Sequence, residues 1–162
     1  MKGAIRVLFV GAAAGYLAGQ LMDQATTWFY ERQSDASKQR EGELLPEGAP
    51  LASARKLAGL IGAEPTDEQA GTIAATLHQG LGQLYGVVAA ALTRRGVPPV
   101  RAGLASGAAG FLLVDELANS LFFTPPPQAY PVESHLRGLV GHLTFGATTG
   151  ALLALARRLG LL

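Results

Sequence analysis

The sequence predicts an all-α integral membrane protein with four transmembrane helices. Charged residues make up only 15% of the 162-residue chain, against about 25% in an average soluble protein. Four stretches carry no charge at all, and many of the 21 glycines lie within them. Glycine inside a helix costs about 1 kcal/mol in water, but in lipid it lets helices approach closely. A soluble bundle of buried helices is therefore the weaker interpretation.

The four uncharged stretches are residues 7–22, 71–92, 102–114 and 138–156. A helix needs about 20 mostly apolar residues to cross a bilayer. The second and fourth stretches meet this length directly. The first does so if the span tolerates Asp23, and the third if it continues through Asp115 and Glu116.

The basic residues predict the orientation of these spans. Seven of them lie at the same ends of the four stretches, with no acidic residue among them: Lys2, Arg6, Arg94, Arg95, Arg101, Arg157 and Arg158. Because cytoplasmic loops of membrane proteins are enriched in Lys and Arg, we expect both termini to be cytoplasmic. Residues 31–70 and 124–134 then face the outside.

The chain contains an internal repeat. At an offset of 64, His78 aligns with His142, Gly82 with Gly146 and Gly86 with Gly150. At an offset of 92, Gly11 aligns with Gly103, Gly15 with Gly107 and Asp23 with Asp115. We therefore predict one integral membrane domain, 1–162, built from two tandem two-helix repeats. The first covers about 4–96, with an outer loop at 31–66, and the second about 100–160. Both cross the membrane in the same sense, so a pseudo-two-fold axis should run along the membrane normal.

Glycines recur at a spacing of four, which places them on one face of each helix. We expect this face to form the contact between helices. The predicted packing glycines are Gly11, Gly15, Gly19, Gly82, Gly86, Gly103, Gly107, Gly146 and Gly150.

Polar residues end these glycine faces at one common depth. Asp23, His78, Asp115 and His142 each lie 14 to 17 positions from the basic residue at the other end of their stretch. At 1.5 Å per residue this is about 21–26 Å, in the outer part of a hydrocarbon layer about 30 Å thick. Glu116 follows Asp115 directly and joins the candidates.

Several functions are open for this layer. The histidines and carboxylates can simply pair and fix the register of the helices. They can also sense or relay protons or ions, because histidine changes its charge near neutral pH. We predict no cofactor outright; His78 and His142 are candidate ligands for zinc, or for a haem b held between two histidines.

No enzyme motif is present, so we do not expect catalysis. The sequence has no phosphate-binding loop, zinc-protease motif or nucleophile elbow, and no basic aromatic patch for nucleic acid. The predicted partners are the lipid bilayer and either a second copy or a larger membrane complex. A small structural or accessory subunit of such a complex is the alternative function.

The predicted outer segments contain three further local sequence patterns. Residues 52–62 form a short amphipathic stretch that we expect on the outer surface. Thr66 and Gln69 have the spacing of a capping box and should start the second long helix. His135 should lie in the first turn of the last helix, at the membrane interface rather than as a ligand.

Three segments resemble the YagU-like family of bacterial inner-membrane proteins. They are MDQATTWFYER (22–32), LHQGLGQLYG (77–86) and PPPQAYPVESHLRGLVGHLTFG (125–146). The family has a domain of unknown function and a member linked to acid resistance. The resemblance implies a location in the bacterial inner membrane and makes Asp23, His78, Asp115 and His142 the family-typical positions.

Overall fold

The structure, a computed structural model, describes residues 2–162, apart from the side chains at positions 2, 119 and 120. Every regular element in this range is a helix, which confirms the all-α class. The side chain of Lys2, used above for the orientation, lies outside the described part.

Four long helical segments contain the four uncharged stretches. They are α1 (Lys2–Arg32), α4 (Asp67–Arg94), α7 (Val132–Arg158) and a third segment in three parts: α5 (Pro99–Gly110), the π-helix η1 (Phe111–Asn119) and α6 (Ser120–Phe122). The shorter elements are α2 (Asp35–Leu44), α3 (Ala49–Gly59) and the 3₁₀-helix η2 (Pro127–Ala129).

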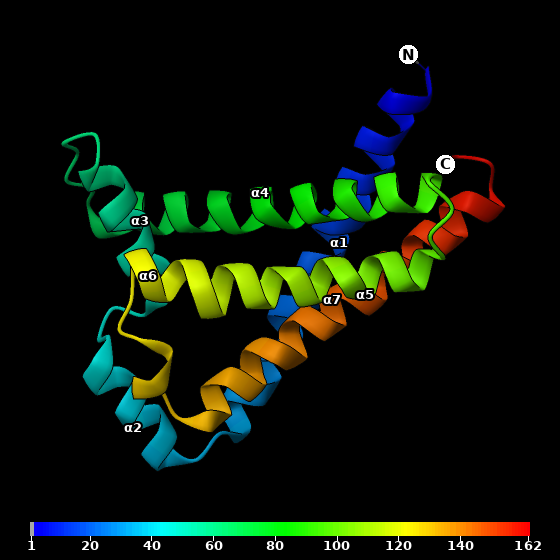
Figure 1. The fold of residues 1–162 in the computed structure, drawn as a ribbon. Coiled ribbons are helices and arrows are strands. Elements are labelled where there is room, and N and C mark those ends of the chain that lie inside the picture. The colour runs from blue at the N-terminus through cyan, green and yellow to red at the C-terminus, as the bar shows by residue number, and fades with distance from the viewer. Residues whose placement is uncertain (1) are drawn as a thin grey trace.

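The long helices pack as a ring of neighbours. Helix α1 lies against α4 and α7, and α5 lies against α7 and α4. Both termini and the α4–α5 turn lie at one end of the molecule, and α2, α3 and α6 lie at the other (Figure 1). At the terminal end, Nη1 of Arg6 donates a hydrogen bond to the carbonyl of Gly160 over 3.3 Å.

Small residues fill the centre of this bundle, and large ones cover its outside. The buried cluster between the helices consists of Val7, Ala14, Ala89, Ala90, Ala102 and Leu153. The exposed large apolar side chains include Leu8, Phe9, Leu17, Leu84, Val88, Leu104, Leu113 and Leu155. A water-soluble helix normally turns its apolar face inward, so this distribution is reversed.

Glycines make the closest helix contacts. A methyl group on Gly15 would collide with the carbonyl oxygen of Gly82, and one on Gly11 would lie 2.6 Å from Cα of Val87. Across α5 and α7, a methyl group on Gly103 would collide with the carbonyl oxygen of Gly146.

The remaining predicted packing glycines contribute unequally. Added methyl groups on Gly86, Gly107, Gly146 and Gly150 would each meet backbone atoms closer than 3.0 Å. Gly82 has only ordinary contacts, the nearest at 3.4 Å, and Gly19 meets only the Gln79 side chain at 3.7 Å.

Within the part of the chain that the structure describes, two helices are long and apolar enough to cross a membrane: Gly3–Arg32 and Val132–Arg158. Helix α4 has sufficient length at 28 residues, but His78, Gln79 and Gln83 interrupt its apolar sequence. Helix α5 has only 12 residues before the π-helix begins.

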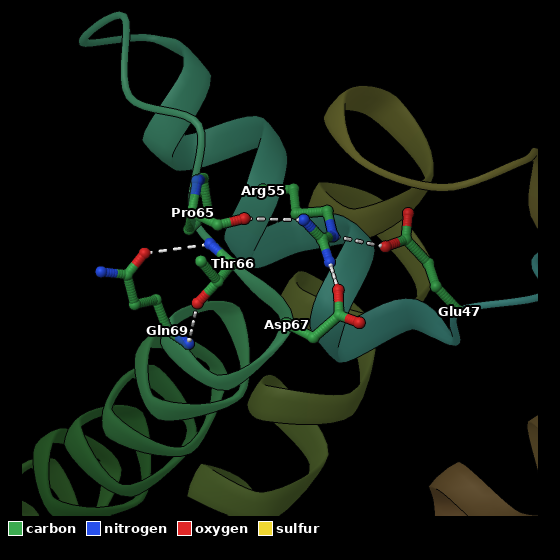
Figure 2. A network of polar contacts seen from close by, with 6 residues as sticks. All are labelled: Glu47, Arg55, Pro65, Thr66, Asp67 and Gln69. Carbon is green, nitrogen blue, oxygen red and sulfur yellow. Dashed lines mark hydrogen bonds and ion pairs between the residues drawn. The ribbon is translucent and has the colours of Figure 1, made fainter.

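Helix α3 is fastened to the start of α4 by Arg55. Its Nε lies 2.8 Å from Oε2 of Glu47, its Nη1 donates to the Pro65 carbonyl over 2.9 Å, and its Nη2 pairs with Asp67 (Figure 2). The predicted capping box of Thr66 and Gln69 is confirmed, with both reciprocal hydrogen bonds present. Residues 52–62 thus lie mainly in a short helix at the end of the molecule opposite the termini (Figure 1).

Candidate functional site

The first predicted aspartate and histidine form a pair between α1 and α4. Nε2 of His78 lies 2.9 Å from Oδ1 of Asp23. Both side chains remain about half exposed. The close glycine contacts lie two and three turns before Asp23 on α1 and one and two turns after His78 on α4, so this pair lies beyond one end of that contact.

The second pair joins the π-helix to α7. Nε2 of His142 lies 3.1 Å from Oδ2 of Asp115, and the ring of Phe111 lies beside the imidazole at 6.0 Å between centroids. This pair is more enclosed than the first. The structure therefore brings together four of the five predicted site residues as two separate pairs.

The fifth predicted residue, Glu116, pairs with a histidine that the sequence analysis had placed outside the site. Nδ1 of His135 lies 2.7 Å from Oε1 of Glu116, and Nε2 lies 3.0 Å from the carbonyl oxygen of Pro127. Both neighbours are acceptors when Glu116 is ionised, and an imidazole has two N–H donors only in its protonated form. Each ring nitrogen of His135 therefore faces an oxygen atom that can accept a hydrogen bond.

The π-helix explains how adjacent acids reach different histidines. Asp115 and Glu116 are neighbours in the chain, but His135 and His142 lie seven positions apart on α7. Both acids belong to η1, where the wider turn alters the angle between successive side chains. Such π segments are often found at functional sites.

The three carboxylates, with His78 and His135, line one cavity of about 780 Å³ at the end of the bundle opposite the termini. Its walls come from α1, α3, α4, η1 and α7, and they include apolar side chains such as Met22, Phe111, Val114 and Phe123. The volume and the mixture of apolar walls with a few convergent polar groups are typical of small-molecule sites.

A smaller recess of about 70 Å³ adjoins this cavity, and the two share lining residues, among them His78 and Asp115. His142, Tyr85 and Ser106 complete its polar lining. Ser106 is only 3% exposed, and its hydroxyl has no hydrogen-bond partner in the described part of the chain. The recess is thus polar, and large enough for several water molecules.

Arg137 enters the cavity but is already neutralised. Its Nη2 lies 2.8 Å from Oε2 of Glu41, its Nη1 donates to Oε1 of Gln33 over 2.7 Å, and its guanidinium lies 5.1 Å from the Tyr30 ring centre. Burial raises the pKa of Glu41. Hydrogen bonds from Arg137, Ser134 and Gln33, together with the charge of Arg137, lower this pKa by more than burial raises it, so that the net shift is downward.

The geometry of the site does not suit a metal ion or a haem. Among the residues that the structure describes, no group of three or more His, Asp or Glu side chains is arranged to hold a metal ion. Nε2 of His78 and of His142 each face an aspartate. The recess that both line, about 70 Å³, is far smaller than a porphyrin.

Comparison of the chain with protein-family models, with curated proteins and with solved structures finds no match.

Proposed function

We propose that the chain is an inner-membrane protein that crosses the bilayer four times. The reversed distribution of residues supports this, because large apolar side chains cover all four long helices while alanine and glycine lie between them. Exposed apolar surface on this scale is unusual for a soluble monomer and suits lipid contact. The start of α1, the end of α4, the start of α5 and the end of α7 lie at the same end of the bundle (Figure 1). These helix ends carry Arg6, Arg94, Arg101 and Arg158, as the positive-inside rule requires.

Equivalent contacts support the two-repeat organisation within this proposal. Gly11 approaches Gly86, and Gly103 approaches Gly150, which are the positions that the offsets of 92 and 64 relate. The histidine–aspartate pairs correspond in the same way. The axis relating the two halves then passes between α4 and α7, and the three pairs lie on the outer side.

We further propose that the outer cavity senses or relays protons. The observation that carries this proposal is that each of the three histidines in the chain pairs with a carboxylate lining a single cavity. A neutral imidazole with an ionised carboxylate carries one negative charge, and one added proton makes the pair neutral. Acidification therefore removes up to three negative charges from the cavity while the Glu41–Arg137 pair stays balanced. Protonation of His135 and His142 would turn both contacts between η1 and α7 into ion pairs, which would draw the two segments together.

The resemblance of residues 125–146 to the YagU-like family supports the same proposal, because it implies a link to acid resistance. The resembling segment contains two of the three histidines, His135 and His142.

Three histidine signals make the proposal directly testable. Protein labelled with ¹⁵N-histidine is reconstituted into vesicles in one orientation, and the imidazole signals are recorded by solid-state NMR while only the external pH is lowered from 8 to 5. We expect the signals of His78 and His142 to change with the external pH. Signals that stay constant, or that follow the internal pH, would refute the proposal.

Acid survival of cells gives a second readout. We expect cells with His78→Gln and His142→Gln to survive external acid less well than wild type at equal protein levels. Unchanged survival with unchanged protein levels would rule out a role of this layer in acid resistance.

A further inference from the structure

We infer that the outer cavity binds a small organic ammonium compound, with the ammonium group in the recess and the apolar body in the wider cavity. This inference rests on the proposed function, because it assigns a ligand to the same site. The observations that support it are the polar groups in the lining of the cavity and the residues that already pair with them.

The charge of the cavity favours a cation. Asp23, Asp115 and Glu116 all line it, and their partners are histidines, which are neutral in their unprotonated form. Among the described residues of the lining, Arg137 is the one permanently cationic side chain, and it pairs with Glu41. With these histidines neutral, the lining carries a net negative charge that a ligand cation would balance.

The unpaired buried groups are oxygens that can accept hydrogen bonds. Ser106 Oγ in the recess and Gln79 Oε1 in the wall of the cavity are both buried and have no partner among the described residues. In each histidine–aspartate pair, the histidine contacts one carboxylate oxygen: Oδ1 of Asp23 or Oδ2 of Asp115. A primary ammonium group brings three N–H donors, which suits this set of acceptors.

The shape of the site separates the two parts of such a ligand. The recess of about 70 Å³ accommodates an ammonium group, which is about the size of a water molecule, and excludes a ring. The adjoining cavity of about 780 Å³ has Phe111, Phe123 and Met22 in its walls. An aromatic or aliphatic body can therefore bury its apolar surface there.

Protons should compete with this cation. The charged groups facing the recess and its mouth are Asp23 from α1, His78 from α4, Asp115 from η1 and His142 from α7, with the Tyr85 hydroxyl beside them. Protonation of the two histidines neutralises both aspartates and adds positive charge where the ammonium would lie. Protonation of the site should thus weaken binding of the organic cation.

The test compares 2-phenylethylammonium with 2-phenylethanol, which has the same body and no charge. Calorimetric titrations use the protein in vesicles of phosphatidylcholine and phosphatidylglycerol, with empty vesicles subtracted. We expect the amine to bind about tenfold tighter than the alcohol at pH 7.5, and to weaken about tenfold at pH 5. Equal binding of the two compounds, or a recess that holds only water so that no amine binds, would overturn the inference.

Isosteric variants locate the binding. Ser106→Ala and Asp115→Asn should each weaken the amine about fivefold or more while leaving the alcohol unchanged. Thr144→Val is the matched control, because its hydroxyl already donates to the Val140 carbonyl over 2.8 Å and lies outside both cavities. Unchanged amine affinity in Ser106→Ala and in a folded Asp115→Asn protein would contradict the assignment.

Two further experiments separate failure of the ligand proposal from failure of the proton proposal. Adding phosphatidylethanolamine to the vesicles shows whether a lipid headgroup supplies the ammonium, since it would then compete with the free amine. The histidine NMR titration is carried out without amine. Loss of that titration with intact amine binding refutes only the proton function, and the reverse result refutes only the ligand.

Discussion

Nε2 of His142 lies 3.1 Å from Oδ2 of Asp115, with side chains that are 12% and 36% exposed. The same contact between His78 and Asp23 measures 2.9 Å, but these side chains are 43% and 50% exposed. Equivalent chemistry therefore operates in two environments. Solvent screens the first-repeat pair more strongly, and the second-repeat pair should carry the larger coupling energy.

Double-mutant cycles measure this difference. We expect Asp115→Asn with His142→Gln to give a coupling energy of about 1 kcal/mol or more. The cycle of Asp23→Asn with His78→Gln should give less than about 0.5 kcal/mol, as exposed pairs do. Chemical unfolding in detergent supplies the free energies of unfolding. A larger coupling for the exposed pair would contradict the burial argument.

The glycine contacts predict a sharp contrast between two alanine substitutions. Gly15→Ala forces a methyl group against the Gly82 carbonyl, a backbone atom that cannot move aside. We expect it to lower the free energy of unfolding by about 1–3 kcal/mol.

The control is Gly80→Ala, where an added methyl group meets nothing within 4 Å. It should be neutral or stabilise the protein by about 0.5–1 kcal/mol, because glycine weakens a helix interior. Thermal unfolding in detergent compares the two variants. Equal stability would mean that α1 and α4 do not meet at this glycine.

Periodicity made much of the fold predictable. The spacing of glycines placed Gly11 and Gly15 on the contact face of α1, and the capping-box spacing of Thr66 and Gln69 located the start of α4. Both signals are local, because they depend on residues within a turn or two of one helix. The π-helix at Phe111–Asn119 could not be predicted, since no residue spacing in this segment signals a wider turn.

The site was predictable in composition but not in pairing. A common depth identified Asp23, His78, Asp115 and His142, since depth follows from helix rise alone. Which groups meet depends on helix rotation and on the outer segments. The Glu116–His135 pair needs η2 to bring the Pro127 carbonyl to His135. Its only sequence signal was that His135 is one of just three histidines in the chain.

Glu41 gives the outer network a defined pH dependence. Its pKa is lowered in the folded protein, from an ordinary value of about 4.3. Stability from its ionised form is therefore fully present above that value and is lost as the pH falls through the folded pKa.

We expect Glu41→Gln to destabilise the protein by about 1–2 kcal/mol at pH 7, since it weakens hydrogen bonds to a charged group. The difference from wild type should shrink below about pH 4. Unfolding measured across this range tests the sign. A difference that grows in acid would contradict the lowered pKa.

Arg55 should hold α3 in place rather than stabilise the whole protein. Its three contacts reach two acids and one carbonyl (Figure 2), and lysine cannot reproduce this fork. Arg55→Lys should cost less than about 1 kcal/mol but increase proteolysis within residues 60–66.

Lys56→Ala removes an exposed positive charge from the same helix and serves as the control. Equal cleavage rates in the two variants would show that Arg55 does not restrain this segment.

The central claim is that the bundle crosses the membrane with the three histidine–carboxylate pairs towards the outside. The chain has no cysteine, so single cysteines report topology without background. Ala63→Cys and Leu161→Cys, both at exposed positions, are treated on intact cells with a membrane-impermeant maleimide. We expect labelling at residue 63 and none at residue 161 until the membrane is permeabilised. Labelling of residue 161 on intact cells, or protection of residue 63, would contradict it.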